Sequence, residues 1–366
     1  MILNRKVIPV GILGATGIVG QNYIKLLDSN PWFEVIDVAA SPRSAGKKYK
    51  EAVNTKWNMS IPIPDKVKDL IVRDVQDFKS IPQGLNVIFS AINMPTKEEI
   101  KKVEFEYAKK GYSVISNNSA HRWTDDVPMV IGEINHEHFE VIKIQQKNRN
   151  FSKGFVIVKP NCSVQCYMTP LYALEKAGYK VEKMIITTLQ AVSGAGYLGV
   201  ASMDIIENVI PYIEGEEEKT EKEPLKIFGR VGSNGIINDD SIEISANCTR
   251  VPVIDGHIAI INLKFKDKIP SIEDIKKIWK DFKSLPQELK LPSAPEHPII
   301  YLEEKNRPQP RKDRDNEKGM AITIGRLRKD TVFDVKFAAL SHNTIRGAAG
   351  GAILNAELLV AKGFIE

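Results

Sequence analysis

The first third of the chain alternates between short apolar runs and amphipathic stretches. The apolar runs have the length of buried strands and lie at residues 7–13, 34–41, 86–91 and 112–117. Residues 17–30 repeat apolar side chains at helical spacing, and the charged segment TKEEIKKVEFEYAKKG separates the last two runs. This strand–helix–strand order predicts an α/β fold with a parallel sheet and right-handed crossovers.

The pattern changes near residue 160. Longer stretches of alternating apolar and polar residues follow at 183–192, 241–253 and 257–265, and the IDG between the last two is typical of a hairpin turn. We therefore expect a second, α+β domain with a largely antiparallel sheet. Residues 343–363 predict a helix of small residues that packs back on the first domain. The expected domains are 1–160 plus 343–366, and 161–342.

Composition is that of an ordinary globular protein, with 43% hydrophobic and 27% charged residues among 366. The net charge of +5 is spread without a basic block, so no nucleic-acid partner is expected. No apolar run reaches the length of a bilayer-spanning helix or a signal peptide, so we expect no membrane partner. Three cysteines form no recognisable disulfide framework, which favours a reducing cytoplasm. The segment EGEEEKTEKE (214–223) is expected on the surface.

A glycine-rich motif, GILGATGIVG, joins the first predicted strand to the first predicted helix. Gly11, Gly14 and Gly17 fall at this junction. Glycines there permit a tight turn and let backbone N–H groups approach a pyrophosphate at the helix N-terminus. Glycines also serve plain helix–strand packing, but their place after the first strand favours a Rossmann-type dinucleotide-binding domain.

The end of the second predicted strand bears on the choice of cofactor. A site for NAD usually places an acidic side chain there for the ribose 2′-hydroxyl. This chain has AASPRSAGKKY, with Ser41, Arg43 and Ser44 and no acid. Hydroxyl groups and a guanidinium suit a 2′-phosphate, so the sequence favours NADP; the alternative is a polar loop whose Arg43 is solvated.

Cys162, in VKPNCSVQC, is a candidate nucleophile, although free cysteines are more often small buried side chains. It opens a predicted helix, whose N-terminus would lower the pKa of the thiol. His257 in RVPVIDGH could take the thiol proton, but sequence alone does not bring the two together. An activated cysteine beside a nicotinamide cofactor would suit aldehyde oxidation through an acyl-thioester. Cys166 and Cys248 are expected to be packing residues.

Several further motifs occur in order over nearly the whole chain: GATGIVG, SPRSAGKKY, SNNSAHRWTDDVP, KPNCS, LQAVSGAGY, RVPVIDGH, RPQPRKDRD and SHNTIRGAAG. Together they resemble the aspartate-β-semialdehyde dehydrogenases of the archaeal and fungal branch. The resemblance implies reduction of β-aspartyl phosphate with NADPH, on the route to lysine, threonine and methionine. It also implies a Rossmann domain joined to a catalytic and dimerisation domain, and a homodimer or homotetramer.

The resemblance implies roles for individual residues. Cys162 would form the acyl-thioester, His257 would act as general acid/base, and Gln190 would orient the intermediate. The substrate would be held by Arg250 at its carboxylate, Arg122 and Lys219 at the phosphate, and Glu216 at the amino group. The run of glutamates in GEEEK leaves the alignment of Glu216 and Lys219 with the family pattern open. The cofactor would lie along Gly14, Thr16, Gly17, Ile18, Val19, Ser41, Arg43, Ser44, Ser90, Ala91, Ser193, Gly194 and Asn343.

Alternatives remain for parts of this hypothesis. Gln190 could cap a strand ladder, and Arg122 could form a local ion pair with Asp125 or Asp126. Val164 and Leu198 depart from the usual family pattern near the site. The same cysteine chemistry would also suit a malonyl-CoA or succinyl-CoA reductase, and a paralogue that binds NADP without turnover is a third possibility. No metal site is expected, since HEH (136–138) lacks a third ligand nearby.

Overall fold

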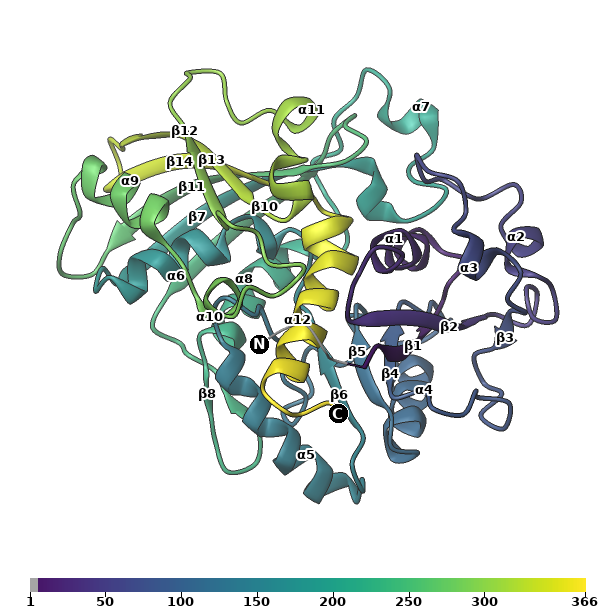
Figure 1. The fold of residues 1–366 in the computed structure, drawn as a ribbon. Coiled ribbons are helices and arrows are strands. Elements are labelled where there is room, and N and C mark those ends of the chain that lie inside the picture. Colours follow the sequence, from purple (N-terminus) through teal and green to yellow (C-terminus); the bar gives the residue numbers. More distant parts are fainter. Residues whose placement is uncertain (1–5) are drawn as a thin grey trace.

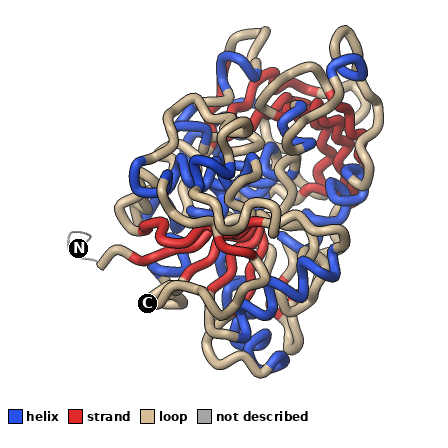
Figure 2. Tube along the Cα trace, turned by 90° about the vertical axis from the view of Figure 1, so that its right-hand side faces the viewer, coloured by secondary structure: helices blue, strands red, loops and turns tan. Residues whose placement is uncertain are grey.

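The computed structural model describes residues 6–366, and its strands form two separate groups (Figure 2). In Figure 1 the helix α12 (Gly350–Ala361) runs beside the first sheet, on the side that faces the second. No helix within residues 6–366 is long and apolar enough to cross a membrane. The predicted combination of a parallel-sheet domain and an α+β domain is confirmed.

The first sheet is parallel throughout and has six strands. In spatial order these are β3 (Arg73–Asp74), β2 (Phe33–Ala40), β1 (Ile8–Leu13), β4 (Val87–Ser90), β5 (Ser113–Ser116) and β6 (Phe155–Val158). The helices of this part are α1 (Ile18–Leu27), α2 (Tyr49–Ala52), α3 (Asp65–Lys68), α4 (Lys97–Lys109), the 3₁₀ turn η1 (His136–Glu140) and α5 (Val141–Arg149). The predicted strands match β1, β2, β4 and β5 because such fully buried parallel strands are continuous apolar runs.

The second sheet is mixed. Its spatial order is β10 (Glu243–Arg250), β7 (Val181–Gln190), β11 (His257–Phe265), β14 (Val335–Ser341), β13 (Ile322–Lys329) and β12 (Ile299–Leu302). The central pairings are antiparallel, and the two edge strands β10 and β12 pair in parallel with their neighbours.

Shorter elements complete this part of the chain. They are η2 (Val164–Cys166), α6 (Met168–Lys176), η3 (Val192–Ala195), α7 (Ser202–Ile205), α8 (Glu216–Ile227), β8 (Arg230–Val231), β9 (Ile236–Ile237), α9 (Ile272–Asp281), α10 (Leu285–Glu288), α11 (Pro310–Asp313), η4 (Asn316–Gly319) and the π-helical turn η5 (Ile345–Ala349).

The predicted hairpin at IDG is wrong. Strands β10 and β11 do not pair; each pairs with β7, which lies between them. After β10 the chain bends and crosses the end of β7, where the N–H groups of Val192 and Ser193 donate to the carbonyls of Val253 and Ile254. This crossing decides the geometry of the site, because it brings the ends of three strands together.

The helix predicted to start at Cys162 is also interrupted. Only the 3₁₀ turn η2 follows the cysteine, and α6 begins at Met168. Pro170 gives the physical reason: inside a longer helix its ring would clash with the carbonyl of residue 166, whereas a proline is tolerated in a first turn. Cys162 therefore does not lie at the N-terminus of a long helix.

Candidate active site

The ends of three adjacent strands carry polar side chains to one edge of the second sheet. Gln190 ends β7, Arg250 ends β10, and these two residues face each other in the parallel register. His257 begins the antiparallel strand β11 on the other side of β7. All three side chains are buried.

Cys162 belongs to the part of the chain that leaves the first sheet, and it lies against this edge of the second sheet. It lies in the loop after β6, and its Sγ is 3.3 Å from Nε2 of His257 and 3.2 Å from Oδ1 of Asn161, which accepts its hydrogen bond. Gly347 in η5 covers the cysteine so closely that a Cβ at that position would lie 2.8 Å from the Cβ of Cys162. The structure thus brings together two predicted residues that are 95 positions apart.

The hydrogen bonds of His257 decide which ring nitrogen carries the proton. The backbone N–H of Ala191 donates to Nδ1 at 3.0 Å. An amide N–H can only donate, so Nδ1 must accept, and the proton of the neutral ring is on Nε2, facing the thiol. Burial, reinforced by the charge of Arg250, lowers the pKa of His257 to about 3. The ring is therefore a neutral hydrogen-bond donor at ordinary pH, and the expectation that it takes the thiol proton does not fit.

The thiol itself is protonated in this arrangement. Burial, with a contribution from Glu216, raises the pKa of Cys162 above its ordinary value, while Lys159 and Arg122 act against the shift. The expected lowering by a helix N-terminus is wrong, because only a 3₁₀ turn follows. Thiol and imidazole form a neutral pair rather than an ion pair.

Glu216, the first residue of α8, organises the groups around the thiol. Its carboxylate accepts from Nδ2 of Asn161 at 2.8 Å, from Nε2 of Gln190 at 3.0 Å and from Nζ of Lys219 at 2.8 Å. Burial alone would raise the pKa of Glu216, but Lys219 and the hydrogen bonds outweigh it and hold the pKa below the ordinary value. Gln190 is thereby held by an acid rather than capping a strand ladder.

The expectation that residues 214–223 lie on the surface is wrong for one face of α8. Glu216, Thr220 and Glu223 are buried. Their spacing of three or four residues places them on one face of the helix. This face is hard to recognise from the sequence, because almost all residues of the segment are charged. The outer positions, such as Glu218 and Lys222, pair with each other in solvent.

Arg122 lies against this buried face. Its Nη1 donates to Glu223 at 2.8 Å, and the other oxygen of Glu223 accepts from the backbone N–H of Asn161 at 2.6 Å. The alternative of a local ion pair with the neighbouring acids is excluded, since Asp126 pairs with Arg149. The Nε of Arg122 has no hydrogen-bond partner among residues 6–366.

Arg250 remains without an acidic partner in the described chain. Its Nη1 donates to the carbonyl of Ala191 at 2.8 Å, and no carboxylate of residues 6–366 lies within ion-pair distance. Gly194 lies directly over it, and a Cβ there would be 2.8 Å from Nη1. The guanidinium is thus buried, fixed in direction and available to an anion.

A cavity of about 280 Å³ extends from Cys162 and Glu216 to the N-terminus of α1, whereas Gln190, Arg250 and His257 are not among its lining residues. It is lined by Ile18, Val19, Asn117, Asn118, Ser119, Arg122, Lys159, Asn161, Cys162, Ser193, Gly194, Gly196, Glu216, Lys219, Asn343, Thr344, Gly347 and Ala348. Predicted cofactor residues and predicted substrate residues therefore line the same space. Nδ2 of Asn343 also donates a hydrogen bond to Oγ of Ser193 at 2.8 Å, which fixes one wall of the cavity.

The turn before α1 fits a pyrophosphate. Gly14 has φ +78°, and a Cβ there would lie 2.3 Å from the carbonyl oxygen of Ala91. Gly17 is the N-cap residue of α1 and has an extended backbone. No side chain accepts a hydrogen bond from the first N–H groups of the helix. A helix end of this kind binds phosphate oxygens.

The remaining predicted cofactor residues are placed differently. Ser41, Arg43 and Ser44 follow the carboxyl end of β2, outside the cavity, and Arg43 is exposed. Ser90 is fully buried, and its hydroxyl donates to Glu104 at 2.6 Å. That hydroxyl faces the interior of the sheet domain, so only the neighbouring Ala91 borders the glycine turn.

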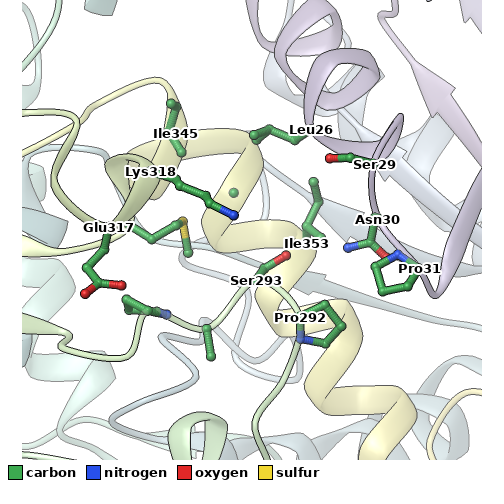
Figure 3. Close-up of a pocket in the computed structure, with 14 residues that line it drawn as sticks. Leu26, Ser29, Asn30, Pro31, Pro292, Ser293, Glu317, Lys318, Ile345 and Ile353 are labelled. Atoms are coloured by element: carbon green, nitrogen blue, oxygen red, sulfur yellow. The ribbon is translucent and has the colours of Figure 1, made fainter. Parts of the chain in front are cut away.

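Another cavity, of about 260 Å³, is lined by residues that include Leu26, Ser293 and Ile353 (Figure 3). Ile345 and Gly350 line it, whereas Gly347 and Ala348 line the cavity of Cys162. None of the predicted site residues lines this second cavity. This second cavity is therefore not part of the candidate site.

Sequence reasoning missed some residues of this site. Asn161 and Glu223 support the thiol and Arg122, and Lys159 lines the cavity. Asn161 adjoins the cysteine in the KPNCS motif, and Glu223 shares a helical face with Glu216, so both left a signal in the sequence. Burial of Lys159 left none, because lysines are almost always exposed.

Comparison with known proteins gives consistent family matches. Residues 9–142 match the family model described as semialdehyde dehydrogenase, NAD binding domain, and residues 171–346 match semialdehyde dehydrogenase, dimerisation domain. The chain is 44% identical to an aspartate-semialdehyde dehydrogenase of Methanothermobacter thermautotrophicus over 96% of this chain and 98% of the relative. It is 43% identical to one of Aspergillus fumigatus over 97% of this chain and 98% of the relative.

A solved structure is similar over the same length. The aspartate-semialdehyde dehydrogenase of Candida albicans, solved with NADP, superposes with a TM-score of 0.88 at 38% identity. The match covers 98% of this chain and 99% of the other.

Proposed function

The chain belongs to the aspartate-semialdehyde dehydrogenase family, and from this premise we propose that it reduces L-aspartyl-4-phosphate to L-aspartate-4-semialdehyde with NADPH. The reaction releases phosphate, is reversible and serves the biosynthesis of lysine, threonine and methionine. The observation that carries the proposal is the 3.3 Å approach of His257 Nε2 to Sγ of Cys162, which lines a cavity that reaches the N-terminus of α1.

Cys162 is the nucleophile of the proposed reaction. Its thiol loses a proton, Sγ bonds to the acyl carbon, and the bond from that carbon to the phosphate oxygen breaks. Phosphate leaves with the bonding electrons and the proton, and an aspartyl thioester remains on Cys162. NADPH, when bound beside Ser193, Gly194 and Asn343, would supply the hydride that reduces the thioester carbon. The resulting alkoxide collapses to the aldehyde, the C–S bond breaks with its electrons on sulfur, and Sγ takes a proton from solvent to restore the thiol.

His257 stabilises the oxyanion in this scheme. Its Nε2–H already faces the sulfur, so it lies beside the oxygen of any carbonyl attached there. A neutral imidazole whose Nδ1 accepts a backbone N–H can polarise a carbonyl without losing its proton. We therefore assign His257 as a hydrogen-bond donor, which refines the acid/base role that the family resemblance implies.

The substrate is held by charges that the fold leaves at the cavity. Arg250 suits the α-carboxylate, because its guanidinium is buried without an acidic partner in residues 6–366. Glu216 suits the α-amino group, and Arg122 and Lys219 suit the phosphate. Gln190 is kept in place by Glu216 and orients the intermediate.

The residues present fit NADP. The turn at Gly14, with Thr16 and Gly17, and the uncapped N-terminus of α1 would hold the pyrophosphate. Ser41, Arg43 and Ser44 would hold the 2′-phosphate, since no acid follows β2. Ser193, Gly194 and Asn343 would border the nicotinamide half.

Changing Arg43 to alanine is expected to raise the KM for NADP about tenfold to a hundredfold, the usual range for loss of a charged hydrogen bond. Arg43 is exposed and makes no contact with an acid in the described chain, so its removal costs the fold little. Steady-state kinetics with NADP and NAD measures the effect. The KM for NAD should stay constant, and Lys109→Ala, an exposed cation at the end of α4, should change neither value.

The proposed assembly is a homodimer or homotetramer in the cytoplasm. The matched dimerisation domain supports self-association, as do exposed apolar side chains such as Met203, Tyr212 and Ile254. All three cysteines are free thiols, in agreement with a reducing compartment.

The test of the proposed function is NADP reduction by the purified protein with L-aspartate-4-semialdehyde, with either phosphate or CoA as acceptor. Reduction that requires phosphate is the expected result. Dependence on CoA, with oxidation of NADPH by malonyl-CoA or succinyl-CoA, would contradict the proposal and indicate an acyl-CoA reductase. Tight NADP binding without turnover on either acceptor would indicate a binding protein.

A further inference from the structure

Lys159 is an unusual cation in the cavity of Cys162. It directly follows β6 and lies three positions before the cysteine. Its side chain is only 2% exposed, although lysines normally keep the ammonium group in solvent. It lines the same cavity as Cys162, Arg122 and Lys219.

The ammonium group of Lys159 uses little of its hydrogen-bonding capacity. Nζ donates to the carbonyl of Pro160, and no carboxylate within residues 6–366 lies at ion-pair distance from it. Lys226 gives the contrast within the same protein. It is equally buried, but its Nζ donates to the carbonyls of Arg122, Thr124 and Val127, which satisfies all three donors. Lys226 has the surroundings of a structural lysine, and Lys159 does not.

The other cations of the cavity are already paired. Arg122 forms an ion pair with Glu223, and Lys219 forms one with Glu216, each at 2.8 Å. Lys159 is thus the cavity-lining cation for which the described chain supplies no acid. Burial, with repulsion from Arg122, lowers its pKa to about 7. A charged lysine in this place is costly, and a negative ligand in the cavity would offset the cost.

We propose that Lys159 is a further binding residue for the phosphate of the reaction, and that it completes the anion subsite formed with Arg122 and Lys219. The inference rests on the proposed function. Phosphate is favoured over the substrate carboxylate, because the buried guanidinium of Arg250 at the end of β10, which has no acidic partner in residues 6–366, is available to that carboxylate. A dianion between Lys159 and the two paired cations would remain close to the acyl carbon on Cys162.

The test is a comparison of Lys159→Met, Lys159→Arg and the wild type in phosphate-dependent NADP reduction. Methionine keeps the length of the side chain and removes the charge. We expect it to raise the KM for phosphate about tenfold to a hundredfold. The kcat at saturating phosphate and the KM values for semialdehyde and NADP should change less than about threefold. Arginine keeps the charge and should recover at least part of the phosphate affinity.

A second readout needs no turnover. Phosphate bound beside Cys162 should slow alkylation of this thiol by iodoacetamide in the wild type, and Lys159→Met should require at least about ten times more phosphate for the same protection. Lys180→Met, an exposed lysine outside the cavity, is the control and should behave as the wild type. An unchanged KM and unchanged protection in Lys159→Met would overturn the inference. A wild type that is protected by phosphate but shows no phosphate-dependent turnover would instead contradict the proposed function.

Thermal stability separates a binding role from a structural one. Lys159→Met removes a buried charge without an acidic partner, so its melting temperature should equal or exceed that of the wild type. Lys226→Met leaves three carbonyls without their donor and should lower it. A clear loss of stability in Lys159→Met, with phosphate affinity retained, would identify Lys159 as structural and contradict the proposal.

Discussion

Cys162→Ala is expected to lose phosphate-dependent NADP reduction by more than about 10⁴-fold in kcat, the range in which loss of a covalent nucleophile normally falls. Without Sγ the acyl group has no atom to which it can transfer, and neither Cys166 nor Cys248 can substitute. Both of these thiols are buried: Cys166 donates to the carbonyl of His257, and Cys248 lies against Thr220. The measurement is kcat with semialdehyde, NADP and saturating phosphate.

The matched control is Cys248→Ala, which removes a buried thiol from β10. It should keep kcat within about threefold, since Cys248 does not line the cavity. Mass spectrometry of the wild type quenched during turnover should show the acyl group on the peptide with Cys162. Turnover in Cys162→Ala comparable to the wild type would exclude the covalent scheme.

The first sheet could be predicted from the sequence because its strands are buried on both faces. The predicted range 7–13 differs from β1 by one residue at its start, and 34–41 differs from β2 by one residue at each end. In the second sheet β7, β10 and β11 were also predicted, but their pairing was not, and no strand was predicted at β12, β13 or β14. A short connection such as IDG favours a hairpin when only the sequence is considered. Insertion of β7 between β10 and β11 depends on contacts between distant segments, which no local pattern records.

The site, too, could be predicted only in part from the sequence. Cys162 and His257 could be proposed from their motifs, whereas their 3.3 Å approach follows from the register of β7 with its two neighbours. The protonation of the pair could not be predicted, because it depends on burial and on one backbone N–H, that of Ala191. Residue types alone suggested that His257 could take the thiol proton, which would form an ion pair. Tertiary burial reverses that assignment.

His257→Ala is expected to lower kcat by about 10² to 10³, the usual effect of removing one oxyanion donor. His257→Gln should recover at least about tenfold of that loss, because a glutamine amide can still donate a hydrogen bond to the oxygen on the acyl carbon. A residue that only supports the fold would not distinguish alanine from glutamine in this way. Steady-state kinetics of both variants, with melting temperatures as the folding control, tests the expectation.

The pH dependence tests the neutral-donor role directly. The pKa of His257 is lowered to about 3, so the ring stays neutral as the pH falls through 6.5, where an ordinary histidine becomes charged. The kcat of the wild type should therefore not fall near pH 6.5 because of His257. Its pH profile in this range should have the same shape as that of His257→Gln. Nitrogen NMR of the wild type should find Nε2 protonated and Nδ1 unprotonated at pH 7, as the hydrogen bond from Ala191 requires. A limb near pH 6.5 that disappears in His257→Gln would show instead that the ring exchanges a proton in the reaction, because only a titrating imidazole can impose that dependence.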